Sequence, residues 1–119
     1  MSLSLPSDSS IFNRQWILEQ IGGDEGLLRE IATVFLTDGP DIRQRLLAAL
    51  RAGDSVALHA TAHCAKSAVG NFGSEAAVLA AVHLEDAAKN GETASFAILT
   101  DTLCQALIEV EDALRQEVS

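Results

Sequence analysis

Aromatic and sulfur-containing residues are scarce in this chain of 119 residues, which has no tyrosine, one tryptophan, four phenylalanines, two cysteines and one methionine. Alternating apolar and polar runs of strand length are absent as well, so the sequence offers little support for a β-sheet. Basic residues are also few, because eight lysines and arginines stand against seventeen acidic residues, for a formal charge of −9. This balance argues against nucleic acid or an anionic membrane as a partner, since both require basic patches.

Long uninterrupted apolar runs are missing, and no run approaches the roughly 18–20 residues of a membrane-spanning helix. Residues 1–10 lack the basic and apolar regions of a secretory signal. The two cysteines, Cys64 and Cys104, do not form a C-x-x-C pair, and without an export signal they are expected to be reduced thiols. We therefore expect a cytoplasmic protein without a membrane partner.

Apolar residues instead recur three and four positions apart along almost the whole chain, which is the pattern of amphipathic helices. Capping and helix-ending residues predict a polar tail over residues 1–10, a single domain over residues 11–119, and helices over about residues 13–20, 24–53, 54–71, 74–89 and 93–117. Gly39-Pro40 lies inside the second helix and predicts a kink or a break there. Because the loops are short, we expect an all-α antiparallel four-helix bundle, with the short N-terminal helix covering one end.

The helix predicted over residues 54–71 carries an unusual combination of side chains. On a helical wheel of about 100° per residue, its apolar residues cluster on one face, namely Leu58, Ala62, Ala65 and Val69. His63 lies about 130° from the middle of that face, so its imidazole is expected to point into solvent. Lys66 and Ser67 follow three and four positions later and flank it. Gly70 lies almost above His63 on the wheel, and His59 lies one turn below it.

An exposed imidazole beside an ammonium group is suited to phosphoryl chemistry with another protein. A neutral imidazole nitrogen is a nucleophile near pH 7, because the ordinary pKa of the group is about 6.5. A phosphoryl group on His63 would carry negative charge, which the nearby Lys66 could offset. The small residues Ser67 and Gly70 would leave room for a partner's active site. Most histidines and lysines on helix faces are merely solvated, however, so helix geometry alone does not establish this role.

The residues around His63 also match a family pattern. The segment from Ala62 to Gly73 resembles the signature of the histidine-containing phosphotransfer (HPt) domain, with matches at Ala62, His63, Lys66, Ser67, Phe72 and Gly73. Other landmarks of the family occur in the same order in this chain: Ile21-Gly22-Gly23-Asp24, Phe35-Leu36-Thr37-Asp38-Gly39-Pro40, Ala49-Leu50 to Gly53-Asp54, and Leu84-Glu85. The resemblance covers about residues 16–115. It is incomplete at Ala65 and Ala68, where the family commonly has leucine and serine.

The resemblance implies a phosphorelay intermediate. His63 would accept a phosphoryl group from the phospho-aspartate of a receiver domain and pass it to another receiver domain, with Lys66 stabilising the charge. His59, Ser67 and Gly70 would contact the partner. The implied partners are response-regulator receiver domains and a hybrid sensor histidine kinase.

The same resemblance implies that the receiver supplies the Mg²⁺, so that the chain needs no cofactor or metal site of its own. The sequence contains neither a P-loop nor a G-x-G-x-x-G nucleotide loop. We therefore expect a phosphoryl carrier that is not an enzyme and does not phosphorylate itself from ATP. A monomer is the simplest expectation.

A metal site is one alternative, because His59 and His63 stand four positions apart and such pairs bind zinc on some helices. Cys64, His83 or an acidic residue would then be the third ligand, although no H-E-x-x-H pattern is present.

A non-catalytic helical adaptor that binds receiver or kinase domains through its acidic surface is the other alternative. The adjacent acidic pairs Glu85-Asp86 and Glu111-Asp112 diverge on a helix, so we expect them to be solvated rather than to act together on a bond.

Overall fold

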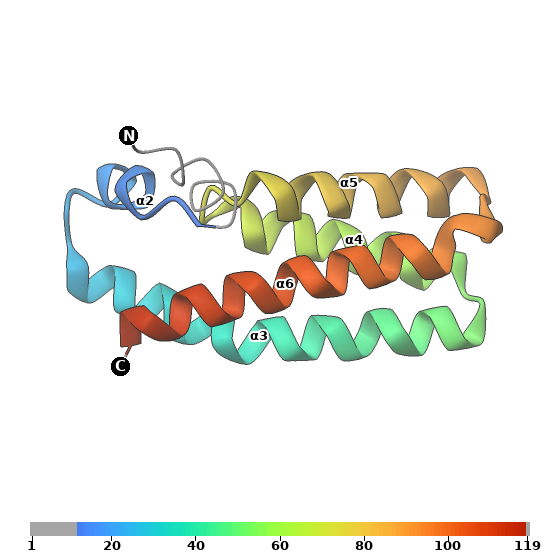
Figure 1. Ribbon diagram of the computed structural model, residues 1–119, viewed down its shortest axis with the longest axis horizontal. Helices are drawn as coiled ribbons and strands as arrows, with labels where there is room; N and C mark the ends of the chain where they lie inside the picture. The colour runs from blue at the N-terminus through green and yellow to red at the C-terminus, as the bar shows by residue number, and fades with distance from the viewer. Residues whose placement is uncertain (1–11, 119) are drawn as a thin grey trace, which may run out of the picture.

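The computed structural model describes residues 12–118, and this part of the chain contains helices and turns but no strand. A short helix, α2 (Arg14–Gln20), precedes four long ones, which are α3 (Glu25–Ala52), α4 (Ser55–Gly70), α5 (Glu75–Asn90) and α6 (Phe96–Val118). A short 3-10 helix, η1 (Thr93–Ser95), leads into α6. Figure 1 shows the long helices running antiparallel in chain order, with α2 at one end of the bundle. The predicted all-α bundle is confirmed, while the predicted tail over residues 1–10 lies outside the described residues.

The helices begin and end at the capping residues of the sequence. The side chains of Asn13, Asp24 and Asp54 accept hydrogen bonds from first-turn backbone N–H groups of α2, α3 and α4. Gly53 and Gly91 end α3 and α5 in the left-handed conformation, with φ of 63° and 69°. These caps keep the turns short, which makes consecutive long helices neighbours.

Helix α3 continues through Gly39 and Pro40, so of the kink or break predicted there, the break is absent. Proline removes one backbone donor from a helix. Phe35 and Ile42, however, are both buried on the core side of α3 and fix the two halves against the same core. Tertiary packing thus outweighs the local signal.

Gly39 has a packing role against α6. A Cβ added at Gly39 would lie 2.8 Å from Oε2 of Glu111. The Glu111 side chain is buried and accepts two hydrogen bonds from Arg43, at 2.8 and 2.9 Å. The expectation that Glu111 is solvated is therefore wrong. Its position four residues after the buried Leu107 places it on the core stripe of α6.

The segment Thr93–Val118 is long and apolar enough to cross a membrane by length and composition alone. The sequence led us to expect no segment of this kind, and that expectation is not confirmed. Within the bundle the apolar stripe of α6 is used for packing, because Leu103, Leu107 and Leu114 are fully buried in the core.

Helices α4 and α5 pack along their length through small side chains. The buried residues of the two helices include Ala62 and Ala65 of α4 and Ala77, Ala81 and Ala88 of α5. Small side chains allow two helices to approach closely. Side chains at the outer edge of α5 can therefore reach those on the solvent face of α4.

The α4–α5 turn is held by α2. The backbone N–H of Asn13 donates to the carbonyl of Phe72 at 3.1 Å. The Phe72 ring makes edge contacts with Phe12 and Phe35, at centroid distances of 6.2 and 5.3 Å. The short helix therefore closes the end of the bundle that follows α4, as the sequence predicted.

Gly73 lies in this turn close to Asn13 and Trp16, and its substitution tests how tightly α2 packs against the turn. It has φ +66°, and an added Cβ would lie 3.1 Å from Asn13 Cβ and 3.2 Å from Trp16 Cε3. Gly91 has a similar φ of +69° with no atom within 4 Å of an added Cβ. Gly91→Ala should cost roughly 1–2 kcal/mol from the backbone conformation. Gly73→Ala should cost about 1 kcal/mol more from overpacking.

Urea unfolding of the two variants measures this difference in the free energy of unfolding. Equal destabilisation by the two alanines would show that α2 does not press on the turn.

Candidate functional site

The solvent face of α4 presents His63, as predicted. The core face of the helix is formed by Leu58, Ala62, Ala65 and Val69, all at 0% exposure. His63 lies on the opposite side with its side chain 60% exposed. The predicted exposure of this imidazole is confirmed, and it follows from the spacing of the apolar residues alone.

Glu85 of α5 joins His63 to Lys66. His63 Nδ1 lies 2.7 Å from Glu85 Oε2, and Lys66 Nζ donates to Glu85 Oε1 at 2.8 Å. The Glu85 side chain is only 12% exposed. The expectation that the Glu85-Asp86 pair is solvated is therefore wrong for Glu85, although Asp86 is exposed.

Lys66 is consequently bound to a carboxylate that it shares with His63. The sequence predicts the cation beside the imidazole but not the carboxylate between them. Leu84-Glu85 was present among the family landmarks. Only the close packing of α4 and α5 shows that this carboxylate reaches across to α4.

The carboxylate fixes the protonation pattern of the site. The hydrogen bond from Lys66 lowers the pKa of Glu85, the hydrogen bond with His63 acts in the same direction, and partial burial opposes both. Glu85 is therefore ionised at neutral pH and can only accept hydrogen bonds. His63 must then carry its proton on Nδ1, which leaves the Nε2 lone pair of the neutral ring available. No hydrogen bond to Nε2 is formed by the part of the chain that the structure describes.

A second imidazole approaches the same carboxylate. His59 Nε2 lies 3.9 Å from Glu85 Oε2, and its side chain is 42% exposed. The distance is too long for a hydrogen bond. His59 therefore borders the site, one turn of α4 below His63.

The space beside His63 is open. Ser67 is exposed, and a Cβ added at Gly70 would meet no atom within 4 Å. Cys64 is exposed on the next position of the helix. The predicted neighbours Ser67 and Gly70 are thus small and leave open space, so that a large partner can approach the imidazole.

Residues 12–118 contain no group of three or more His, Cys, Asp or Glu side chains arranged to hold a metal ion. The pair His59 and His63, considered above as metal ligands, both face Glu85.

The fold and the site define a helical bundle that offers one carboxylate-bound imidazole to solvent. The chain belongs to the Hpt domain family, whose model matches residues 30–117. This family places it among the phosphotransfer proteins of two-component phosphorelays.

Two solved structures share the fold. Histidine-containing phosphotransfer protein B from Pseudomonas aeruginosa PAO1 is 25% identical, with a TM-score of 0.82 over 90% of this chain and 93% of that one. The HPT domain of a sensor hybrid histidine kinase from Shewanella is 21% identical, with a TM-score of 0.79 over 91% of this chain and 93% of that one. No curated protein is similar enough to the chain to count as a match.

The Glu85 bridge should be lost in acid. Because the pKa of Glu85 is lowered in the folded state, its contribution to stability is complete above the ordinary value of 4.5 and falls as pH drops through the lowered pKa. Glu85→Gln should therefore be less stable than wild type by about 1 kcal/mol at pH 7. This difference should shrink below about pH 4.

Asp86→Asn provides the control, because it removes the same charge from the next, exposed residue. Urea unfolding from pH 7 to pH 3 measures both variants. A pH-independent gap between Glu85→Gln and wild type would contradict an ionised bridge.

Proposed function

We propose that His63 accepts a phosphoryl group from the phospho-aspartate of a receiver domain and returns it to the aspartate of another. The observation that carries this proposal is the exposed imidazole whose Nδ1 is engaged by Glu85 at 2.7 Å, while Nε2 has no hydrogen-bond partner among the described residues. Such a ring is a nucleophile with one available nitrogen.

The transfer step follows from this arrangement. The Nε2 lone pair attacks phosphorus, an N–P bond forms, and the P–O bond to the aspartyl carboxylate breaks, so that the carboxylate leaves with the electron pair. No proton moves in this step, because Nδ1 keeps its hydrogen against Glu85. The phosphorylated ring then carries a positive charge, which the ionised Glu85 stabilises. The reverse step transfers the group to a second aspartate.

Lys66 provides the opposite charge for the phosphoryl group. Its side chain is 33% exposed, and it stands three positions after His63 on the same helix. Glu85 holds its Nζ near the imidazole at the cost of partly neutralising it. We infer that the phosphoryl oxygens compete with Glu85 for this ammonium group.

The remaining components belong to the partners. Receiver domains provide the aspartates and the Mg²⁺, and a hybrid sensor histidine kinase supplies the phosphoryl group at the start of the relay. The chain itself acts as a cytoplasmic, monomeric carrier that neither binds ATP nor phosphorylates itself. Ser67 and Gly70 leave space for the receiver beside His63.

Phosphoryl labelling tests the acceptor. Incubation with a phosphorylated receiver domain should label the chain in an acid-labile, base-stable form, and His63→Gln should abolish the label. His83→Gln, which changes an exposed histidine of α5, should be labelled like wild type. Label that persists in His63→Gln would move the acceptor to another histidine, and no label on any variant would favour the adaptor alternative.

Substitution of Lys66 tests charge stabilisation. Lys66→Ala should slow transfer roughly tenfold, which is less than the loss of an enclosed oxyanion donor because this site is open to water. Lys66→Arg should restore part of the rate, and the circular dichroism spectrum of both variants should remain helical. Transfer at the wild-type rate in Lys66→Ala would remove this role.

A further inference from the structure

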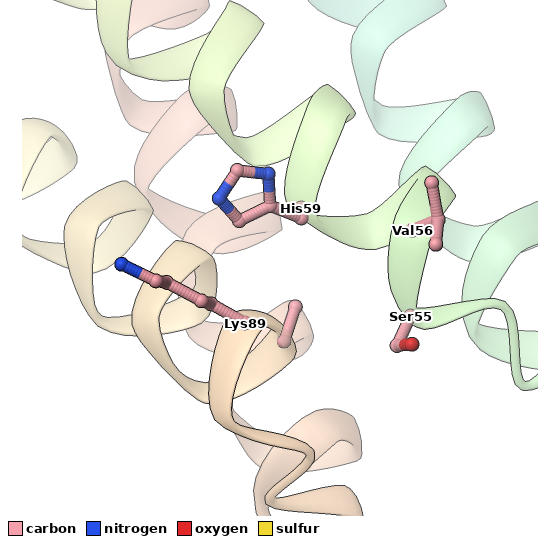
Figure 2. Close-up of a pocket in the computed structure, with 5 residues that line it drawn as sticks. Ser55, Val56, His59 and Lys89 are labelled. Atoms are coloured by element: carbon pink, nitrogen blue, oxygen red, sulfur yellow. The ribbon is translucent and has the colours of Figure 1, made fainter.

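A second feature of the α4–α5 face is a hollow between the start of α4 and the end of α5. Its volume is about 430 Å³, and it is lined by Ser55, Val56, His59, Ala88 and Lys89. Figure 2 shows His59 and Lys89 on one side of the hollow and Ser55 and Val56 on the other. The lining therefore combines two basic groups with an apolar edge.

Lys89 is an exposed cation that forms no ion pair within residues 12–118. Among the described residues it takes part in no ion pair, whereas Lys66, the other lysine of the chain, is held by Glu85 at 2.8 Å. Lys89 and the imidazole of His59 line the same hollow. Such a spot is complementary to a carboxylate.

The apolar edge of the hollow is strongly exposed. Val56 is 78% exposed, the largest value among the large hydrophobic side chains of residues 12–118. A free small anion would gain nothing from this side chain. A protein partner that carries an acidic and an apolar residue side by side would use both parts of the lining.

The hollow is continuous with the site. His59 lines it and also approaches Glu85 Oε2, the oxygen that engages His63. His59 precedes His63 by one helical turn on the same face of α4. A partner that covers His63 from this side therefore extends over the hollow.

We propose that this hollow is a docking subsite for the receiver partner, in which a partner carboxylate contacts Lys89 and His59 and an adjacent apolar side chain covers Val56. This inference rests on the proposed function, because it assigns the orientation of the same partner. The subsite contributes to recognition and takes no part in the chemical step, since it lies a full turn away from His63.

Two donors separate docking from reactivity. Phosphoramidate is a small donor that needs no docking surface, so the rate at which it labels the chain reports the reactivity of His63. A phosphorylated receiver domain must dock before it transfers. Lys89→Glu should raise the KM for the receiver about tenfold. A tenfold change corresponds to the loss of about 1.4 kcal/mol of binding free energy. The same substitution should change kcat and the phosphoramidate rate less than twofold.

Arg29→Glu is the matched control. It makes the same charge change at an exposed residue of α3, in a hollow with Gly26, Glu30 and Thr33 that contains no α4 or α5 residue. Its KM for the receiver should stay within twofold of wild type. Val56→Ser should raise KM without changing the net charge.

The outcomes are distinct. A KM that rises in Lys89→Glu and Val56→Ser, but not in Arg29→Glu, supports the subsite. Equal effects of the two charge reversals would show that only net charge matters and would overturn it, as would an unchanged KM in Lys89→Glu. Failure of wild type to be labelled by either donor would instead refute the proposed function itself.

Discussion

The site depends on one carboxylate that is shared between two helices. Glu85 comes from α5, yet both of its oxygens are used by residues of α4, with His63 on one and Lys66 on the other. An ionised group in this position sets the tautomer of the imidazole and the position of the ammonium group together. His63 is 60% exposed and has no pocket walls to hold it, so this contact supplies the orientation that a pocket would otherwise give.

The rest of the bundle determines where that carboxylate lies. Alanines at the α4–α5 contact allow the close approach across which Glu85 reaches. The turn between the two helices is closed by α2 through the Asn13–Phe72 hydrogen bond and the close contact at Gly73. Packing far from His63 therefore fixes the register between α4 and α5, on which the distances in the site depend.

The sequence predicts the helices well because capping residues and apolar spacing act locally. Asp24, Asp54 and Gly53 mark helix ends whatever the tertiary structure. The exposure of His63 follows for the same reason. The sequence does not predict the burial of Glu85 and Glu111, because whether an acidic side chain is solvated depends on which helix lies beside it. Glu111 still left a signal in the core stripe of α6, whereas the reach of Glu85 to α4 required the packed structure.

The proposed function requires an acidic chain to receive a negatively charged group, and the arrangement of the site is compatible with this. The seventeen acidic residues outnumber the eight basic ones and give an overall charge of −9, which repels phosphoryl groups at long range. At the site, the carboxylate is paired with Lys66 and contacts the imidazole on its Nδ1 side. In the transfer proposed above, the incoming group approaches Nε2, while the carboxylate contacts Nδ1 on the other side of the ring. Under this proposal, Glu85 stabilises the positive charge of the phosphorylated ring from the Nδ1 side, away from the phosphoryl oxygens on Nε2.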